Sequence, residues 1–447
     1  MNKEIMYLPI VDEESQLIAY NPRTAQYRRI NANQDLEAQI NPELYPELYD
    51  DPNETPNIVT SIYQLNIANT RRCNLGCSYC YDHQGEKGAN YLNTPLMTES
   101  VARKSIDQLI QSSGDQEKLF VCLIGGEALV HGRIIKYMID YAEESTQNIN
   151  KTFFFTVYTN GTLLNKQWVE WANEHFVTLV LSMDGDEKTH DKERVFIDGR
   201  GTHARVLKAA KLMLEEYINP SKEVRAVVSD PNADPVQVFD YLVGLGFNKI
   251  HITPAYDPET LGFRTHIEKW KALTDRYRQL LSDNIIVSLT PYTEHINKFL
   301  NGKKMLTSFY PCNVGSGALG ISPDGSVYPC HHFLDEPDWK LGSIEDGFPE
   351  LPNRDNLYFS VDDRTNCSKC WVRHICGGEC YHRAVTVDVG YSGTQRSACD
   401  EKRELIQYSM GVAAHLAEHY PMVIERLLSD NLSTVEECRE YYASKNQ

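Results

Sequence analysis

The sequence predicts an α/β fold built on a parallel sheet and followed by a small cysteine-rich segment. Short apolar segments of high β-propensity recur through residues 61–256, and longer segments with helical periodicity separate them. This alternation is typical of βαβ units, whose strands run parallel and are buried on both faces. It fits an open doubly wound sheet or a partial barrel, and in either fold ligands bind at the carboxyl ends of the strands. The predicted strands cover residues 61–69, 118–126, 152–160, 178–185, 223–230 and 249–256.

The remaining segments complete a four-part organisation. Two apolar stretches near the N-terminus predict a hairpin, and residues 41–57, rich in Pro, Asp and Glu, predict a linker. Helices are predicted at 101–113, 133–144, 203–217, 235–246, 268–283 and 402–420. The predicted regions are a short α+β extension at 1–60, an α/β domain at 61–304, a cysteine-rich domain at 305–400 and a helical tail at 401–447.

Composition excludes several classes of protein. The 447 residues carry a formal net charge of −18, which argues against a nucleic-acid partner because phosphates require a basic surface. The charge permits a basic peptide partner, although keeping the protein in solution is its simpler role. No stretch approaches the roughly 18 apolar residues of a membrane span, and the N-terminus lacks a secretory pattern. We therefore expect a cytoplasmic protein with no membrane partner.

The twelve cysteines point to metal. In a large chain without a secretory signal, clustered cysteines indicate metal ligands more often than disulfides. Two of them stand apart: Cys122 falls within a predicted strand and is expected to be a buried thiol, and Cys438 lies in the tail. The other ten form two groups, Cys73, Cys77 and Cys80 in one, and Cys312, Cys330, Cys367, Cys370, Cys376, Cys380 and Cys399 in the other.

The first group follows the first predicted strand with the spacing C-x3-C-x2-C, and Tyr79 precedes its last cysteine. Structural zinc sites take four protein ligands, so three thiols alone are unusual for zinc. On a cubane iron–sulfur cluster, three thiolates leave one iron open to a small molecule.

This triplet resembles the signature of the radical S-adenosylmethionine (SAM) superfamily, and the resemblance continues along the predicted strands. Gly125-Gly126-Glu127 ends the second strand and is similar to the family's GGE motif, which binds the methionine amino group. A carboxylate pairs well with an ammonium group, and glycines let a ligand approach the backbone. The resemblance assigns cluster ligation and SAM cleavage to Cys73, Cys77 and Cys80, and SAM contacts to Tyr79, Gly125, Gly126, Glu127, Asn160, Ser182, Asp184 and Arg194. For Arg194 a solvated surface position is the competing interpretation, and for Tyr79 a place in the core.

The family resemblance implies a partial (β/α)6 TIM-like barrel over about residues 60–300. It also implies that one electron from the reduced cluster cleaves SAM and yields a 5′-deoxyadenosyl radical, which abstracts hydrogen from a substrate. An external electron donor of the flavodoxin or ferredoxin type is then required.

The second group matches the seven-cysteine pattern of the SPASM extension, which accompanies radical SAM enzymes that modify peptides and proteins. A zinc ribbon is the alternative for its two close pairs. By resemblance, Cys367, Cys370, Cys376 and Cys399 hold one auxiliary cluster and Cys312, Cys330 and Cys380 the other, giving three [4Fe–4S] clusters in all. The second auxiliary cluster then lacks a fourth cysteine. Another residue such as Cys438 completes it, or an open iron binds a substrate thiolate.

The sequence leaves three candidate functions. The sequence around YPCHHF resembles maturases of ribosomally made peptides (RiPPs), so the preferred function is formation of a thioether or other crosslink in a precursor peptide, with residues 1–60 as a reduced peptide-recognition hairpin. Anaerobic sulfatase maturases share the architecture but carry an aspartate base where this chain has His331, which is a candidate proton acceptor here. The third function is a non-catalytic zinc or electron-transfer protein.

Overall fold

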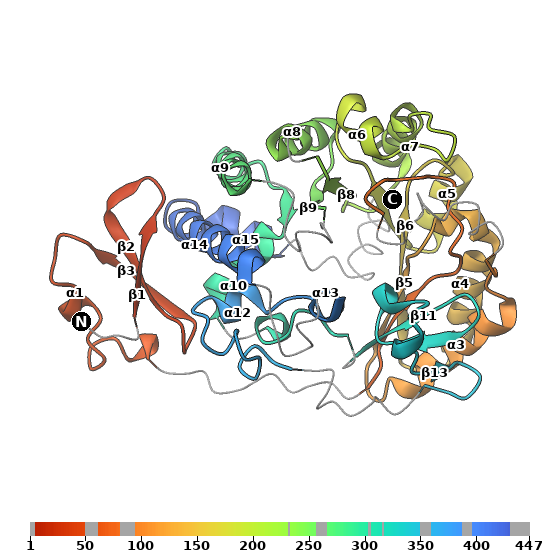
Figure 1. Ribbon diagram of the computed structural model, residues 1–447, viewed down its shortest axis with the longest axis horizontal. Coiled ribbons are helices and arrows are strands. Elements are labelled where there is room, and N and C mark those ends of the chain that lie inside the picture. Colours follow the sequence, from red (N-terminus) through yellow and green to blue (C-terminus); the bar gives the residue numbers. More distant parts are fainter. Residues whose placement is uncertain are drawn as a thin grey trace.

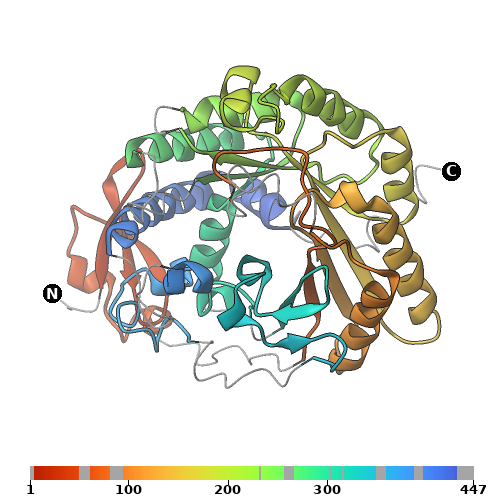
Figure 2. The same cartoon turned by 45° about the vertical axis from the view of Figure 1, so that its right-hand side comes forward.

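The computed structural model describes residues 5–49, 61–80, 94–230, 233–255, 266–302, 305–314, 317–348, 359–386 and 396–429. Its centre is a ten-stranded sheet that curves into an open barrel (Figures 1 and 2). Seven neighbouring strands of this sheet run parallel, and each is connected to the next through helical segments. They are β4 (Gln64–Ile67), β5 (Lys118–Leu123), β6 (Thr152–Thr159), β7 (Thr178–Ser182), β8 (Glu223–Val228), β9 (Lys249–Pro254) and β10 (Ser288–Thr290).

The partial barrel is confirmed, and the first six of these strands coincide with the six predicted ones. Two features exceed the prediction. A short seventh parallel strand, β10, extends one edge. At the other edge, β11 (Ala318–Ile321) pairs parallel to β4, and β12 (Ser326–Tyr328) and β13 (Gly342–Ser343) continue antiparallel. The cysteine-rich region therefore begins as an extension of the barrel sheet.

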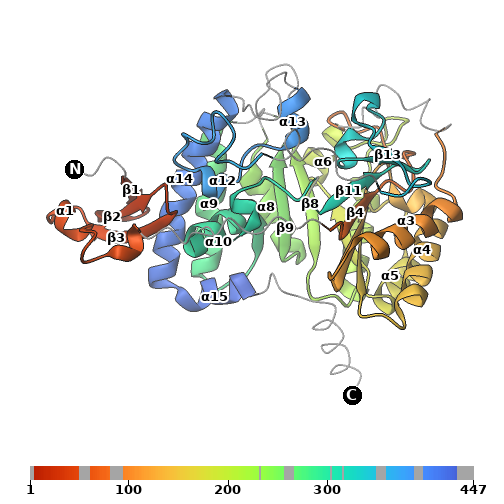
Figure 3. The same ribbon diagram turned by 90° about the horizontal axis from the view of Figure 1, so that it is seen from below.

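Helices cover the outer face of the sheet (Figure 3). Their ends follow local sequence signals: Thr98 caps α3 by accepting a hydrogen bond from the Val101 N–H, and α8 begins with Pro235 after the cap Asp234 and ends at Gly246 in the left-handed region. The predicted helices are present as α3 (Glu99–Ser112), α4 (Gly132–Thr146), α7 (His203–Glu216), α8 (Pro235–Leu245) and α9 (Ile267–Ser282). The sequence analysis did not predict α5 (Lys166–Glu174) or α6 (Glu187–Glu193).

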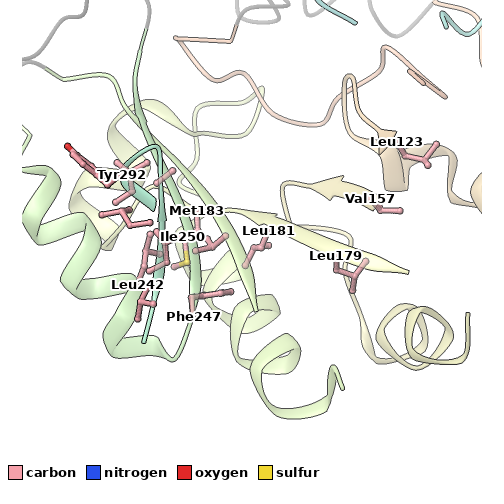
Figure 4. Close-up of a cluster of buried hydrophobic side chains, with 14 of the residues drawn as sticks. Leu123, Val157, Leu179, Leu181, Met183, Leu242, Phe247, Ile250 and Tyr292 are labelled. Carbon is pink, nitrogen blue, oxygen red and sulfur yellow. The ribbon is translucent and has the colours of Figure 1, made fainter. Parts of the chain in front are cut away.

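Alternating strand residues fill the core between the sheet and these helices. Leu179 and Leu181 on β7, Ile250 on β9, Leu242 of α8 and Phe247 belong to one cluster of buried side chains (Figure 4). All five are at most 1% exposed. Burying side chains of this size contributes about 1.5–3 kcal/mol each before entropy is counted. The opposite face of the strands is left free to line a cavity.

The N-terminal extension forms a separate three-stranded antiparallel sheet instead of the predicted hairpin. It comprises β1 (Met6–Ile10), β2 (Glu13–Asn21) and β3 (Gln26–Asn31), followed by α1 (Leu36–Gln39) and the 3-10 turn η1 (Pro46–Leu48). The predicted linker at 41–57 is described only to residue 49, and its remainder lies outside the described residues.

The C-terminal region returns to both sheets. Turns and short helices carry the cysteines: η5 (His331–Phe333), α12 (Arg373–Cys376) and α13 (Tyr381–Thr386). The predicted tail helix begins earlier than expected, as α14 (Arg396–His419), and α15 (Pro421–Ser429) follows it. Helix α14 packs on α9, on α10 (Tyr292–Asn301) and on β1, so it joins the N-terminal sheet to the barrel. Among the described helices, none combines the length and apolar character needed to cross a bilayer.

Candidate active site

A cavity of about 680 Å³ opens at the carboxyl ends of the parallel strands. One part of its wall comes from the loop after β4 and the ends of β5, β6 and β7, and the other from α10, α14 and the cysteine-rich region. Pockets of this size fall in the range that encloses small molecules. The predicted site residues that line it are Cys73, Cys77, Tyr79, Cys80, Gly125, Gly126, Glu127, Asn160, Ser182, Arg194 and Cys376.

The three cysteines after β4 face this cavity from one ordered loop. The loop is held against the segment after α6, because Gly76 N–H donates to the Val195 carbonyl at 2.8 Å and Ser78 N–H to the Glu193 carbonyl at 3.1 Å. Burial raises the pKa of the Cys73 thiol, and Glu127 and the neighbouring thiols raise it further. Thiolates here therefore require a cationic partner, which an iron–sulfur cluster supplies. Three thiols on one cavity wall fit a cluster with one open iron.

The turn at Gly125 and Gly126 can be made only by glycine. Their φ angles are +127° and +47°, and a Cβ on Gly126 would lie 2.4 Å from the Arg72 carbonyl oxygen. The Glu127 N–H donates to the same carbonyl at 2.9 Å. This turn therefore ties the end of β5 to the cysteine loop.

Glu127 is 1% exposed, and its carboxylate is fixed by the end of β6. It accepts hydrogen bonds from Thr159 Oγ1 at 2.7 Å, from the Asn160 N–H at 2.6 Å and from the Leu129 N–H at 3.1 Å. Burial raises the pKa of Glu127, and these donors only partly offset that effect. A cationic ligand in the cavity would restore the ordinary pKa, so the residue fits an ammonium group.

Asn160 connects the cysteine loop to β6. Its side-chain amide donates to Asn74 Oδ1 at 3.0 Å and lies 3.8 Å from Cys73 Sγ, and its carbonyl oxygen accepts from the Thr162 hydroxyl at 2.6 Å. Asn160 is thus brought next to the first predicted cluster ligand.

Arg194 and Tyr79 converge on Asp184 beneath the cavity. Arg194 Nε donates to Asp184 Oδ2 at 3.1 Å, the Tyr79 hydroxyl donates to the same oxygen, and the Val227 N–H reaches Oδ1 at 2.9 Å. The Arg194 guanidinium also lies 5.6 Å from the centre of the Tyr79 ring. Burial would raise the pKa of Asp184, but Arg194, His190 and these hydrogen bonds hold it below its usual value.

These positions change two sequence expectations. Arg194 is 8% exposed, so the solvated surface position considered for it is wrong. Asp184 is 2% exposed and is not among the residues that line the cavity, in contrast to its predicted contact with SAM. Both of its oxygens are occupied by protein donors, which gives it a supporting place behind Arg194 and Tyr79.

The second cysteine group forms two clusters of thiols, as the SPASM resemblance implies. Burial raises the pKa values of Cys312 and Cys330, and the nearby Cys380 thiol raises both further, so the three thiols lie together. Cys367, Cys370, Cys376 and Cys399 line a separate cavity of about 200 Å³. All are free thiols rather than disulfides. These donor sets fit two iron–sulfur clusters, and Cys438 lies outside the described residues.

His331 is not at the cavity wall. The following residue, His332, lines the cavity instead, because neighbouring side chains of the short 3-10 turn point in different directions. The His331 and His332 rings lie 4.1 Å apart, and His382 stacks on His332 at 5.3 Å. The predicted role of His331 as a proton acceptor in contact with substrate is therefore not supported by its position.

Four cations of the cavity wall were missed by the sequence analysis: Arg225, Lys298, Arg383 and Lys402. Arg225 on β8 donates to His251 Nδ1 at 3.0 Å, and Lys298 on α10 is 6% exposed. Within the described residues neither has a carboxylate within 4.0 Å. The sequence could have predicted the position of Arg225. Val224 and Ala226 on either side of it face the core, so the strand alternation places Arg225 on the cavity face.

Family models match two parts of the chain. The radical SAM superfamily model matches residues 68–242, and the SPASM model, an iron–sulfur cluster-binding domain, matches residues 312–371. The chain therefore contains a radical SAM domain followed by a SPASM domain. Its cofactors are SAM, a [4Fe–4S] cluster and auxiliary iron–sulfur clusters, so the non-catalytic interpretation is wrong.

Similar proteins include a sulfatase-maturating enzyme and a cyclopropyl synthase. This chain is 24% identical over 334 residues to a cysteine-type anaerobic sulfatase-maturating enzyme of Clostridium perfringens. The alignment covers 69% of this chain and 85% of that enzyme. This chain is 22% identical over 360 residues to the radical SAM cyclopropyl synthase TigE of Paramaledivibacter caminithermalis, covering 77% and 72%.

Solved structures share the fold. The sulfatase-maturating enzyme anSMEcpe with bound AdoMet superposes with a TM-score of 0.67 at 21% identity, covering 80% of this chain and 99% of that one. Streptococcus suis SuiB bound to its precursor peptide SuiA gives 0.55 at 16% identity, covering 89% and 99%.

Proposed function

We propose that this radical SAM/SPASM enzyme is a peptide maturase that removes hydrogen from a ribosomally made precursor peptide and installs a thioether or other crosslink. The observation that carries the proposal is the cavity itself. One continuous space is lined both by the cysteine loop after β4 and by Cys376 and His332 of the SPASM region. A substrate bound there would contact the site of radical formation and the auxiliary-cluster region at once.

When bound, SAM and the reduced cluster supply the radical that takes a hydrogen atom from the substrate. The protein residues position this chemistry. The buried Glu127 carboxylate offers an ion pair to the methionine ammonium group, and Gly125 and Gly126 bring backbone close to it. Arg194, held by Asp184, offers its remaining N–H groups to the methionine carboxylate.

Apolar residues of the cavity wall would exclude water from the reacting atoms. Ile252 of β9, Trp270 of α9 and Tyr292 of α10 are all buried and line it. Exclusion of water protects a reactive species from side reactions. The same surfaces suit an apolar or aromatic peptide side chain.

The three-cysteine auxiliary site motivates the crosslink. Cys312, Cys330 and Cys380 supply three ligands, and a substrate thiolate is a chemically suitable fourth. A cluster held by these cysteines would offer a binding position to the thiolate and would accept the one electron released when the C–S bond forms to a carbon that has lost a hydrogen atom. His332, two residues after Cys330, lines the cavity, whereas the three cysteines do not. The finer assignment to a thioether rests on this ligand count.

Sulfatase maturation is the second candidate function, and one observation favours it: several similar proteins are sulfatase-maturating enzymes. Against it, the residue after Cys330 is His331 instead of an aspartate, and His331 is not on the cavity wall. Among the described residues that line the cavity, none is an aspartate.

The decisive experiment uses anaerobically reconstituted enzyme with SAM and an external electron donor. Candidate peptides are those encoded beside the gene, compared with a sulfatase peptide containing the cysteine or serine target. The proposal is supported if the peptide encoded beside the gene loses hydrogen, tandem mass spectrometry finds a crosslink in it, and 5′-deoxyadenosine forms in an equal amount. Conversion of the sulfatase peptide alone would replace it with sulfatase maturation.

A further inference from the structure

A cluster of three metal-ligand side chains lies between the N-terminal sheet and α14, separate from the cysteines. Glu13 begins β2, and His415 and His419 stand on successive turns of α14, more than 400 residues away in sequence. The two elements lie side by side in the views of Figures 1 and 3. The ligand atoms of all three residues lie within 4.8 Å of one another.

The distances fit a shared ion better than simple hydrogen bonds. Glu13 Oε1 lies 3.2 Å from His415 Nδ1 and 3.3 Å from His419 Nε2. Charge-assisted N–H···O bonds are usually about 2.7–2.9 Å long. Two ligand atoms about 2.0–2.1 Å from a tetrahedral zinc ion lie about 3.3 Å apart, which is the spacing found here.

The surrounding charges also favour a dication. Arg29 pairs with Glu13 through both carboxylate oxygens, Nη1 with Oε1 at 3.3 Å and Nη2 with Oε2. This pairing orients the Glu13 carboxylate with Oε1 turned to the histidines. Glu418 adds a second carboxylate, whose Oε2 lies 3.9 Å from Arg29 Nε. When both imidazoles are neutral, the two carboxylates of Glu13 and Glu418 and the guanidinium of Arg29 give the site a net negative charge.

We propose that Glu13, His415 and His419 bind one Zn²⁺ ion, with water completing its coordination. Histidines at i and i+4 of a helix present two imidazoles on one face, and a carboxylate from another element completes a common three-ligand zinc set. The ion ties the N-terminal sheet to α14. The first turns of this helix carry Lys402, Leu405 and Ile406, which line the active-site cavity, so the tie also fixes one wall of that cavity.

The packing around the site is already close enough to support such a tie. A Cβ on Gly411, one turn before His415, would lie 2.8 Å from the Pro9 carbonyl oxygen. Arg29 additionally donates to the Ala414 carbonyl at 3.3 Å. The backbone of α14 therefore meets β1 without intervening side chains, which leaves the two histidines facing Glu13.

The test uses iron-loaded enzyme dialysed against a buffer with micromolar free Zn²⁺, followed by elemental analysis. The double variant His415→Gln, His419→Gln keeps side-chain N–H donors to Glu13 but loses the imidazole ligands. His175→Gln is the matched control, because His175 bonds Glu143 at 3.1 Å without a second histidine. Since losing an outer partner alone costs about 10–100-fold in metal affinity, losing two ligands should cost more.

One zinc per chain in the parent and in His175→Gln, absent from the double variant, is the expected result, with X-ray absorption showing nitrogen and oxygen neighbours. Zinc should raise the midpoint temperature of thermal unfolding of the parent enzyme, and this rise should disappear in the double variant. Equal zinc in all three proteins, sulfur neighbours, or no bound zinc in the parent would overturn the proposal. Cluster content, measured as iron, should be the same in all three, so that failure here is separate from failure of the proposed peptide chemistry.

Discussion

Arg194 donates a hydrogen bond from Nε to Asp184 Oδ2 across 3.1 Å, and both side chains are buried where the cavity wall meets the core. Breaking a buried ion pair by neutralising one partner typically costs about 3–5 kcal/mol, because the other charge is left buried without compensation. The pair therefore holds Arg194 in place for a ligand carboxylate, and removing either charge should destabilise the protein even though the intact pair need not be a net gain.

Replacing Asp184 with asparagine tests this relationship. Asp184→Asn should destabilise the protein by about 3 kcal/mol and weaken SAM binding, since Arg194 and Tyr79 lose their common acceptor. Urea unfolding and equilibrium SAM binding measure the two effects. Asp198→Asn, at an exposed pair with Arg200, is the control and should change neither. Unchanged SAM affinity in a folded Asp184→Asn protein would contradict the supporting role.

The glycine turn gives a second prediction. Gly126→Ala places a methyl group 2.4 Å from the Arg72 carbonyl oxygen at a φ of +47°, so the turn must shift and Glu127 must move with it. SAM binding should fall by at least tenfold, roughly the effect of 1.4 kcal/mol, measured by equilibrium binding to cluster-loaded enzyme.

Gly244→Ala is the matched control for that turn. Gly244 lies inside α8, where a Cβ would meet nothing within 4 Å. Alanine there should stabilise the helix by about 1 kcal/mol and leave SAM binding unchanged. Equal SAM affinity in both variants would show that the turn tolerates a side chain.

Sequence patterns predicted the six barrel strands and the two cysteine groups because both depend on local spacing. Contacts made across long sequence distances left no such pattern. The pairing of β11 with β4 joins residues about 250 positions apart, and the approach of Glu13 to α14 spans more than 400. Side-chain direction was equally hidden in the turn that carries His331 and His332, because no strand or helix period sets which of the two faces the cavity.

The place of Asp184 shows a different limit. A family motif indicates that a segment contacts the cofactor, but it does not separate residues that touch the ligand from those that support them. In SMDG, Ser182 lines the cavity and Asp184 lies behind it, accepting from Tyr79 and Arg194. Only the three-dimensional arrangement distinguishes the two.

Cluster assignment can be tested with single cysteine variants. Cys77→Ala should lower the iron content by about four from roughly twelve per chain and abolish 5′-deoxyadenosine formation with dithionite and SAM. Cys122→Ala is the control, because Cys122 lies within β5, outside both cysteine groups, and its sulfur accepts a contact from Gln64 Nε2 at 4.0 Å. If Cys77→Ala kept its full iron content and still cleaved SAM, the three cysteines would not bind the cluster that cleaves it. If Cys122→Ala lost iron, Cys122 would be an unexpected cluster ligand.

Lys298 provides the last prediction, which concerns the substrate. Its ammonium group is buried in the cavity wall, and burial lowers its pKa with only partial compensation from Glu294 one turn earlier. A buried cation without a close carboxylate gains most from a ligand that brings one. We therefore expect Lys298 to bind an acidic side chain of the substrate peptide. Lys298→Met keeps most of the side-chain volume and should raise the Michaelis constant for an acidic peptide roughly tenfold, with less change in kcat.

Two comparisons make this result specific. Lys222→Met removes a half-buried lysine outside the cavity, beside Tyr217, and should leave the Michaelis constant unchanged. Replacing the acidic residues of the peptide with their amides should weaken binding to the parent enzyme but not to Lys298→Met, because the two partners of one ion pair do not add. Additive losses would place the peptide carboxylate elsewhere. If Lys298→Met instead altered the spectrum of the auxiliary cluster and left peptide binding unchanged, the role of Lys298 would be to stabilise the thiolates around Cys376. The negative charge of Cys376 already raises the pKa of Lys298.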